Sequence, residues 1–416
     1  MHFRSDFLWG IASAGHQVEG NNINSDIWAM EQVPDTPIAE PSGDACDSYH
    51  RYEEDIDLVA CAGLNSYRFS TEWSRIEPEP GKFSRAELDH YRRMVDACHQ
   101  RGIEPVLTLN HFTVPAWFAR DGAWSQDAAP ALFERFTQRV VEHLGDAVTW
   151  WGTFNEPNAG ALLLSSGELP FGDVDQHSEF GRRQAARAEA FARRVGGSPD
   201  VATMALPILA PHAIENVFEA HRRSRAVIKE LLPNAMVGWS IAVHDFQAAP
   251  GGEGRVAEIM ATAIEPFWDA AKDDDYIGIQ TYTRQVFGPD GRVEPEDASP
   301  HETLTGWEYY PAAVAHTAVQ AAAHTGRPVL ITENGIATSD DSLRVSYTEE
   351  ALSALHEAVA DGLDLRGYIH WMLLDTWAFG GGYRIRFGMV DVDRQTFART
   401  PKPSLARFGE FARSAN

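Results

Sequence analysis

Eight apolar runs alternate with segments of helical periodicity along almost the whole chain. Most of these runs are continuously apolar, which is typical of parallel strands covered on the outside by helices. Eight strand–helix units favour a closed (β/α)8 TIM barrel of the α/β class over an open doubly wound sheet. No G-x-G-x-x-G motif follows the first run, which also counts against the open sheet. The predicted strands are Leu8–Ala14, Asn65–Trp73, Ile103–His111, Thr149–Pro157, Met236–His244, Tyr276–Thr283, Pro328–Gly335 and Leu365–Asp375.

Helix signals lie between the runs. Ser84 and Glu87 have the spacing of a capping box, and Gly102 is placed to end the helix that follows. No linker, internal repeat or low-complexity tract interrupts the pattern, so residues 1–416 are predicted to form one barrel domain. Further helices are predicted at Asp127–Leu144, Ala213–Leu232, Pro311–Thr325, Thr348–Ala360 and Pro403–Ala412, and long segments on the C-terminal rim at 158–201, 284–309 and 376–402.

The charge balance narrows the range of partners. The 416 residues include 35 Lys and Arg against 60 Asp and Glu, a net charge of −25. A field of this sign repels nucleic acid and anionic membrane surfaces, so neither is an expected partner. No run of eighteen apolar residues is present, and the N-terminal residues have no secretory-leader pattern. We therefore expect a cytoplasmic protein whose three cysteines are small buried thiols.

Polar and acidic residues stand at the ends of several predicted strands. His111, Glu156, Glu333 and Asp375 each finish an apolar run. Burying an unpaired carboxylate is costly, so an apolar strand rarely ends in one unless it faces a functional site. Two glutamates that face each other across a barrel mouth are the equipment for glycoside hydrolysis. Each glutamate alone could equally form a rim salt bridge or a helix cap, so the pair and its flanking sequence decide between these interpretations.

Six segments carry a family resemblance from Phe7 to about Asp393. Together, in order and at these spacings, they resemble glycoside hydrolase family one, the β-glucosidase family. The resemblance implies a retaining β-glycosidase on a (β/α)8 barrel that acts on small-molecule β-glycosides or oligosaccharides without a metal or an organic cofactor. The segments are FLWGIASAGHQVEG, YRFSTEWSRIEPEPGKF, LNHFTVPAWF, TFNEP, ITENG and HWMLLDTWAFGGGYRIRFGMVDVD.

The resemblance also implies roles for individual residues. Glu156 in TFNEP would be the general acid/base, and Glu333 in ITENG the nucleophile. Arg68 and Tyr282 match the residues that contact the nucleophile in the family. For the sugar hydroxyls, neutral amides and imidazole suit vicinal hydroxyls because they can both donate and accept. The matching sugar-binding residues are Gln17, His111 and Asn155, with Trp371 as the aromatic platform under the ring.

Four departures from the family pattern concern the sugar pocket. Ala378 stands where the family has the glutamate that grips the 4- and 6-hydroxyls, and Phe379 replaces the tryptophan that follows it. Phe112 and Gln280 replace a tryptophan and an asparagine. Losing a charge-assisted contact should cost a few kcal/mol of glucose binding, so we expect a pocket that is altered around C4 and C6. Such a pocket could hold a 6-substituted sugar or a disaccharide released whole.

Other functions stay open at this point. A catalytically weak sugar-binding homologue would also explain the disrupted pocket. An NAD-linked barrel oxidoreductase lacks a phosphate-binding signature, and Arg384 and Arg386 give only weak support for a phosphosugar. No HExxH motif or close His/Cys cluster predicts a metal site. The natural glycone and aglycone, transglycosylation and the oligomeric state, including a homo-oligomer, are not determined by the sequence.

Overall fold

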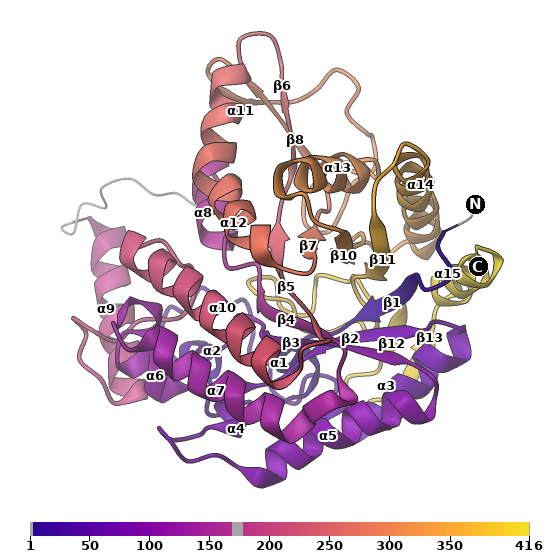
Figure 1. The fold of residues 1–416 in the computed structure, drawn as a ribbon. Helices are drawn as coiled ribbons and strands as arrows, with labels where there is room; N and C mark the ends of the chain where they lie inside the picture. Colours follow the sequence, from indigo (N-terminus) through magenta and orange to yellow (C-terminus); the bar gives the residue numbers. More distant parts are fainter. Residues whose placement is uncertain (1–2, 169–177, 416) are drawn as a thin grey trace.

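The computed structural model describes residues 3–168 and 178–415. Its centre is a closed barrel of parallel strands in the order β1-β11-β10-β7-β5-β4-β3-β2 (Figure 1). The prediction of a (β/α)8 barrel is therefore confirmed. The barrel strands are β1 (Leu8–Ala12), β2 (Ser66–Ser70), β3 (Glu104–Asn110), β4 (Trp150–Asn155), β5 (Met236–Ala242), β7 (Ile277–Gln280), β10 (Val329–Asn334) and β11 (Leu365–His370).

The observed strands are shorter than the predicted apolar runs. The eighth run was expected to reach Asp375, whereas β11 ends at His370. Beyond His370 the backbone keeps two hydrogen bonds to the neighbouring barrel strands, from Trp371 N to Asn334 O at 2.9 Å and from Leu373 N to Ala12 O at 3.0 Å. It then leaves the barrel, because Asp375 N donates to Val390 O at 2.8 Å. The apolar residues beyond a strand end are buried against the rim segments, so their hydrophobicity carries no information about where pairing stops.

Helices surround the barrel (Figure 1). The predicted start at Ser84 is confirmed but its capping box is incomplete, and the predicted start at Thr348 is wrong. Ser84 accepts from Glu87 N, but the Glu87 carboxylate accepts from Tyr49 at 2.9 Å, so only half of the capping box forms. The helix predicted from Thr348 begins at Asp341, because Asp340 caps it by accepting from Ser342 N at 2.9 Å. The outer helices are α3 (Ser48–Ala62), α5 (Arg85–Gln100), α7 (Ala129–Leu144), α10 (Pro211–Leu231), α12 (Glu265–Ala270), α13 (Ala313–Thr325), α14 (Asp341–Ala360) and α15 (Pro403–Ser414).

The rim segments contain more structure than the sequence pattern showed. Part of the predicted segment 158–201, residues 169–177, lies outside the described residues. A three-stranded sheet, β6-β8-β9, and a two-stranded sheet, β12-β13, were not predicted. The rim elements are α1 (Gly15–Val18), α2 (Asp26–Glu31), α4 (Trp73–Ile76), α6 (Ala116–Arg120), α8 (Ala159–Ser165), α9 (Glu179–Val195), α11 (Glu253–Ile259), β6 (Asp245–Ala248), β8 (Arg284–Gly288), β9 (Gly291–Val293), β12 (Val390–Val392) and β13 (Arg399–Pro401).

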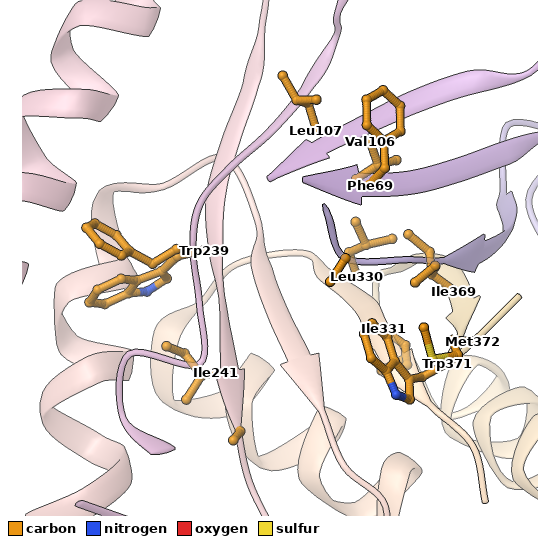
Figure 2. Packing of buried hydrophobic residues seen from close by; sticks show 14 of the residues in the cluster. Phe69, Val106, Leu107, Trp239, Ile241, Leu330, Ile331, Ile369, Trp371 and Met372 are labelled. Atoms are coloured by element: carbon orange, nitrogen blue, oxygen red, sulfur yellow. The ribbon is translucent and has the colours of Figure 1, made fainter. Parts of the chain in front are cut away.

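The core is built from side chains of the barrel strands and of the helices that cover them. Figure 2 shows buried residues from β2, β3, β5, β10 and β11, among them Phe69, Leu107, Trp239 and Leu330. Burying such side chains is the main stabilising contribution to a fold of this type. Of the three cysteines, Cys46 and Cys98 are buried, but Cys61 is exposed, so the expectation of three buried thiols was wrong.

The two ends of the described chain are in contact. Phe3 N donates to Ala415 O at 3.3 Å, so the first described residue lies at the C-terminal end of α15 (Figure 1). No helix within residues 3–168 and 178–415 is long and apolar enough to cross a membrane.

Candidate active site

Glu333 lies in β10 and is held by two donors from other strands. Arg68, from β2, donates through Nη1 to Glu333 Oε1 at 2.6 Å. Tyr282, just after β7, donates its hydroxyl to Glu333 Oε2 at 2.5 Å. Both oxygens of a carboxylate that is only 3% exposed are thus hydrogen-bonded. Hydrogen bonds to the charged form favour ionisation, so this arrangement supports a buried negative charge.

Glu156 directly follows the last residue of β4. Its backbone N–H donates to Ser240 O of β5 at 2.8 Å, and its φ is 45°. Positive φ is uncommon for a residue other than glycine and is enriched at functional sites. The backbone bend turns the half-buried carboxyl into the same cavity that Glu333 lines. The two glutamates, far apart in sequence, therefore face one enclosed space.

The surroundings of the two carboxyls differ in a way that gives Glu156 and Glu333 different tendencies to hold a proton. Burial raises the pKa of Glu156 well above its usual value, and the nearby Glu333 charge raises it further. Burial also raises the pKa of Glu333, but Arg68, Tyr282 and Gln280 all act in the opposite direction. This environment favours the proton on Glu156 and the charge on Glu333.

Four neutral side chains around these carboxyls each keep a buried polar atom that has no hydrogen-bond partner among the described residues. Leaving a buried polar atom unpaired costs about 1–3 kcal/mol, so a ligand with hydroxyl groups would be stabilised by forming hydrogen bonds with these atoms. The atoms are Gln17 Oε1, His111 Nδ1, Asn155 Nδ2 and Gln280 Oε1.

The remaining polar atoms fix the orientation of these side chains. Gln17 Nε2 donates to Trp377 O at 2.9 Å. Asn155 Oδ1 accepts from Arg68 Nη2 at 2.6 Å and from Gln280 Nε2 at 2.8 Å. Burial, with the Arg68 charge, lowers the pKa of His111 well below its usual value, so its ring is neutral. A neutral imidazole has one donor and one acceptor, as recognition of a hydroxyl requires.

Trp371 lies at the end of the eighth barrel strand beside His111. The two rings are stacked, with centroids 5.7 Å apart and an interplanar angle of 7°. Trp371 is 6% exposed and lines the cavity, so part of an aromatic face is available to a ligand. A sugar presents apolar C–H groups on its ring faces, which pack against such a surface.

One cavity of about 660 Å³ joins these residues. Every site residue predicted from the sequence lines it except Arg68, which reaches the site through its contact with Glu333. The volume lies in the range of sites that enclose a whole small-molecule ligand. The predicted residues that line the cavity are Gln17, His111, Asn155, Glu156, Gln280, Tyr282, Glu333, Trp371, Ala378 and Phe379.

The segment around Ala378 is shaped by backbone contacts. Ala378 and Gly382 exchange hydrogen bonds of 3.0 and 2.9 Å across a tight turn. Gly382 has a φ of 59°, and a Cβ at this position would lie 2.5 Å from the Glu40 side chain. Phe379 packs edge-on against Phe112, with ring centroids 5.1 Å apart. This side of the cavity is therefore walled by aromatic rings and by a turn that carries hardly any side chains.

Two residues singled out in the sequence lie elsewhere. Asp375 does not line the cavity, because its carboxylate accepts from Lys402 Nζ at 2.6 Å and from Gly388 N at 2.8 Å. Arg386 is exposed and also lies outside the cavity, whereas Arg384 lines it. Asp375 thus forms a structural ion pair with Lys402, which is the alternative to a functional role that the sequence analysis left open for acidic residues at the ends of apolar runs.

The structure also adds cavity residues that the sequence analysis missed. His244 lines the cavity next to the end of β5, and it could have been recognised by the same signal as His111, a histidine that ends an apolar run. Trp307 comes from the long segment before α13, and no local pattern marked it. Its ring lies 5.4 Å from that of Tyr282.

Comparisons with known proteins agree over nearly the whole chain. The sequence profile of glycosyl hydrolase family 1 matches residues 1–250 and 269–416. The chain is 31% identical to a β-glucosidase of Agrobacterium sp., over 97% of this chain and 93% of that protein. It is 27% identical to β-glucosidase A of Thermotoga maritima, over 97% and 96%. A crystal structure of the β-glycosidase BGL167 superposes with a TM-score of 0.92 at 44% identity, covering 99% of this chain and 97% of the other.

Proposed function

The chain belongs to glycosyl hydrolase family 1 and is a retaining glycoside hydrolase of the β-glucosidase type, and on this premise we propose that Glu333 is its nucleophile and Glu156 its acid/base. Glu333 attacks the anomeric carbon while Glu156 gives its proton to the departing oxygen, which leaves as an alcohol. Glu156 then takes a proton from water, whose oxygen displaces Glu333 from the sugar. Two inversions at one carbon give net retention.

The observation that carries this assignment is the contrast between the two carboxyls in one cavity. Glu333 accepts from Arg68 at 2.6 Å and from Tyr282 at 2.5 Å. Glu156 is the carboxyl whose pKa burial and the Glu333 charge raise well above its usual value. An attacking carboxylate must be ionised and a general acid must hold a proton, so the donors support these roles in this order.

We further propose that the glycone pocket is altered around C4 and C6. Ala378 and Phe379 line the cavity and offer no carboxylate or indole N–H to sugar hydroxyls. Among the residues predicted to bind the sugar, those with a polar atom that lacks a partner are Gln17, His111, Asn155 and Gln280. A sugar bound by one polar edge, with its other edge against Ala378 and Phe379, could carry a 6-substituent or a second sugar unit there.

Azide rescue tests the assignment of both glutamates. Glu333→Gly with azide and an activated aryl glycoside should yield a glycosyl azide of inverted configuration. Glu156→Ala under the same conditions should yield the azide of retained configuration, because the covalent intermediate still forms. Glu357→Ala, at an exposed position of α14, is a matched control outside the cavity, and it should hydrolyse the substrate without forming an azide product. Failure of both cavity variants to give any product would favour a sugar-binding homologue.

A panel of aryl β-glycosides tests the altered pocket. With a constant aryl group, kcat/KM is measured for the glucoside, for a 6-substituted glucoside and for a disaccharide glycoside. The proposal expects the substituted or disaccharide substrate to match or exceed the plain glucoside. A plain glucoside that is turned over much faster than every substituted analogue would refute it.

A further inference from the structure

The cavity lining that comes from the rim is chemically unlike the lining that comes from the barrel strands. The strand ends contribute the polar residues, whereas two rim segments contribute a surface of aliphatic side chains. This surface, the aliphatic wall, consists of Leu162, Leu163, Met204, Leu206 and Pro207, all of which line the cavity.

Two rim segments build the wall, α8 and the chain that precedes α10. They are in close contact at Gly160, where a Cβ would lie 2.9 Å from Pro207 Cβ and 2.8 Å from Ile208 O. The second segment is anchored from below, because Asp26 Oδ2 accepts from Ala205 N at 3.0 Å. The wall is therefore fixed by packing and by a buried hydrogen bond.

Part of the aliphatic wall lies close in sequence to Glu156, the residue proposed to protonate the leaving group. Glu156 directly precedes the turn into α8, and Ala159 N donates to Glu156 O at 3.0 Å. Leu162 and Leu163 belong to the helix that begins three residues after Glu156, and they line the same cavity as Glu156. If Glu156 protonates the leaving oxygen, as proposed above, the group attached to that oxygen extends along the wall.

A sugar would bind poorly in this position. Hydroxyls that pack against the aliphatic wall would give up water without gaining partners there, because its five side chains carry no N–H or O–H group, and burying an unpaired hydroxyl costs free energy. Apart from the two glutamates, Arg384 is the one Asp, Glu, Lys or Arg residue among the described lining residues. Its guanidinium donates to Leu304 O at 3.2 Å. An apolar group loses nothing by leaving water and gains up to about fourfold in affinity for each buried methylene.

We infer that the aglycone of the natural substrate is an apolar alcohol or phenol and not a further sugar. This inference rests on the proposed function for its orientation, and it names the substrate class on the leaving-group side of the same site. His244, which is 6% exposed and lines the cavity, keeps Nδ1 without a partner among the described residues and could meet a single polar group on such a molecule.

Binding of alkyl 1-thio-β-glycosides tests the inference without hydrolysis. Methyl, butyl, hexyl and octyl derivatives, on the sugar that the aryl panel favours, are titrated by calorimetry below their critical micelle concentrations. Affinity should rise with chain length, by at least about tenfold from methyl to octyl. The β-linked thio-disaccharide, whose aglycone is a sugar, should bind no better than the methyl compound.

Two neighbouring leucines of α8 provide a matched pair of variants. Leu163 lines the cavity, whereas Leu164 is 38% exposed and does not. Leu163→Asn should reduce octyl affinity about tenfold and leave methyl affinity unchanged, and Leu164→Asn should change neither. Equal affinity for all chain lengths, or tighter binding of the thio-disaccharide, would overturn the inference. Because binding does not require turnover, a failed azide rescue and a failed chain-length dependence are separate results.

Discussion

Arg68 donates a hydrogen bond from its guanidinium Nη1 to Glu333 Oε1 at 2.6 Å, and Arg68 is itself only 1% exposed. A charge buried this deeply needs a partner, and Arg68 and Glu333 satisfy each other across two non-adjacent barrel strands. The second terminal nitrogen, Nη2, donates to Asn155 Oδ1 at 2.6 Å, which ties the orientation of a cavity-lining amide to that of the carboxylate. The positions of the Glu333 carboxylate and the Asn155 amide are therefore coupled through the Arg68 guanidinium.

Tyr282→Phe should impair the enzyme by removing one of the two donors to Glu333. A hydrogen bond to a charged group contributes about 1.5–3 kcal/mol, so kcat/KM should fall about 10- to 150-fold. The hydroxyl lowers the pKa of Glu333, so its loss should raise that pKa and shift the acidic limb of the pH–rate profile to higher pH. Tyr310→Phe, outside the cavity, should show neither change; an unshifted acidic limb in Tyr282→Phe would contradict the proposed role.

Glu156→Gln should separate substrates by their leaving groups. Alkyl glycosides need a proton on the departing oxygen, so their kcat/KM should fall by about 10²–10⁴. A 2,4-dinitrophenyl glycoside needs no such help, and its first step should be nearly unaffected. The raised pKa of Glu156 predicts that loss of its proton produces the alkaline limb of the wild-type profile. That limb should vanish in the variant, and its persistence would assign it to another group.

Ala378→Glu should shift the sugar preference towards plain glucosides. A carboxylate at this half-buried, cavity-lining position can accept from free 4- and 6-hydroxyls. With a charge-assisted hydrogen bond of about 1.5–3 kcal/mol, the ratio of kcat/KM for the plain glucoside to that for a 6-substituted glucoside should rise about 10- to 150-fold. Ala186→Glu on an exposed face of α9 is the control. An unchanged ratio in Ala378→Glu would show that this side of the cavity does not meet C4 and C6.

Asp26→Ala should destabilise the fold near the aliphatic wall. Asp26 accepts from Val114 N and from Ala205 N, each at 3.0 Å, and both amides would lose their buried partner. The free energy of unfolding, measured by denaturant titration, should fall by about 2–4 kcal/mol. Asp391→Ala, at an exposed position of β12, should change it little.

The effect of Asp26→Ala should also depend on pH. Burial raises the pKa of Asp26 to about 6, from an unfolded value near 3.8. A raised folded-state pKa adds stability below the unfolded pKa, and this contribution is lost as the pH rises through the folded pKa. The difference in stability between wild type and variant should therefore narrow from pH 5 to pH 7. A difference that widens over this interval would contradict the assigned pKa.

The sequence predicted the barrel because hydrophobic runs and helical periodicity are local properties of the chain. The same local signal failed where tertiary contacts decide the outcome. The eighth run continues past β11 because buried rim residues are as apolar as strand residues, and α14 begins at Asp341 because a side chain caps it there. Likewise, Asp375 and Glu333 both end apolar runs, but the lysine that neutralises Asp375 comes from a distant segment.

The sequence itself thus determined the order of strands and helices, the acidic net charge and the residue types available for the site. Each of these follows from composition and short-range pattern. Only the tertiary structure decided which polar atoms stay unpaired, which carboxyl keeps donors and which keeps a proton, and that two rim segments meet at Gly160 to form an aliphatic wall. Those properties depend on distances between residues that are remote along the chain, and burial and Coulomb energies are functions of such distances.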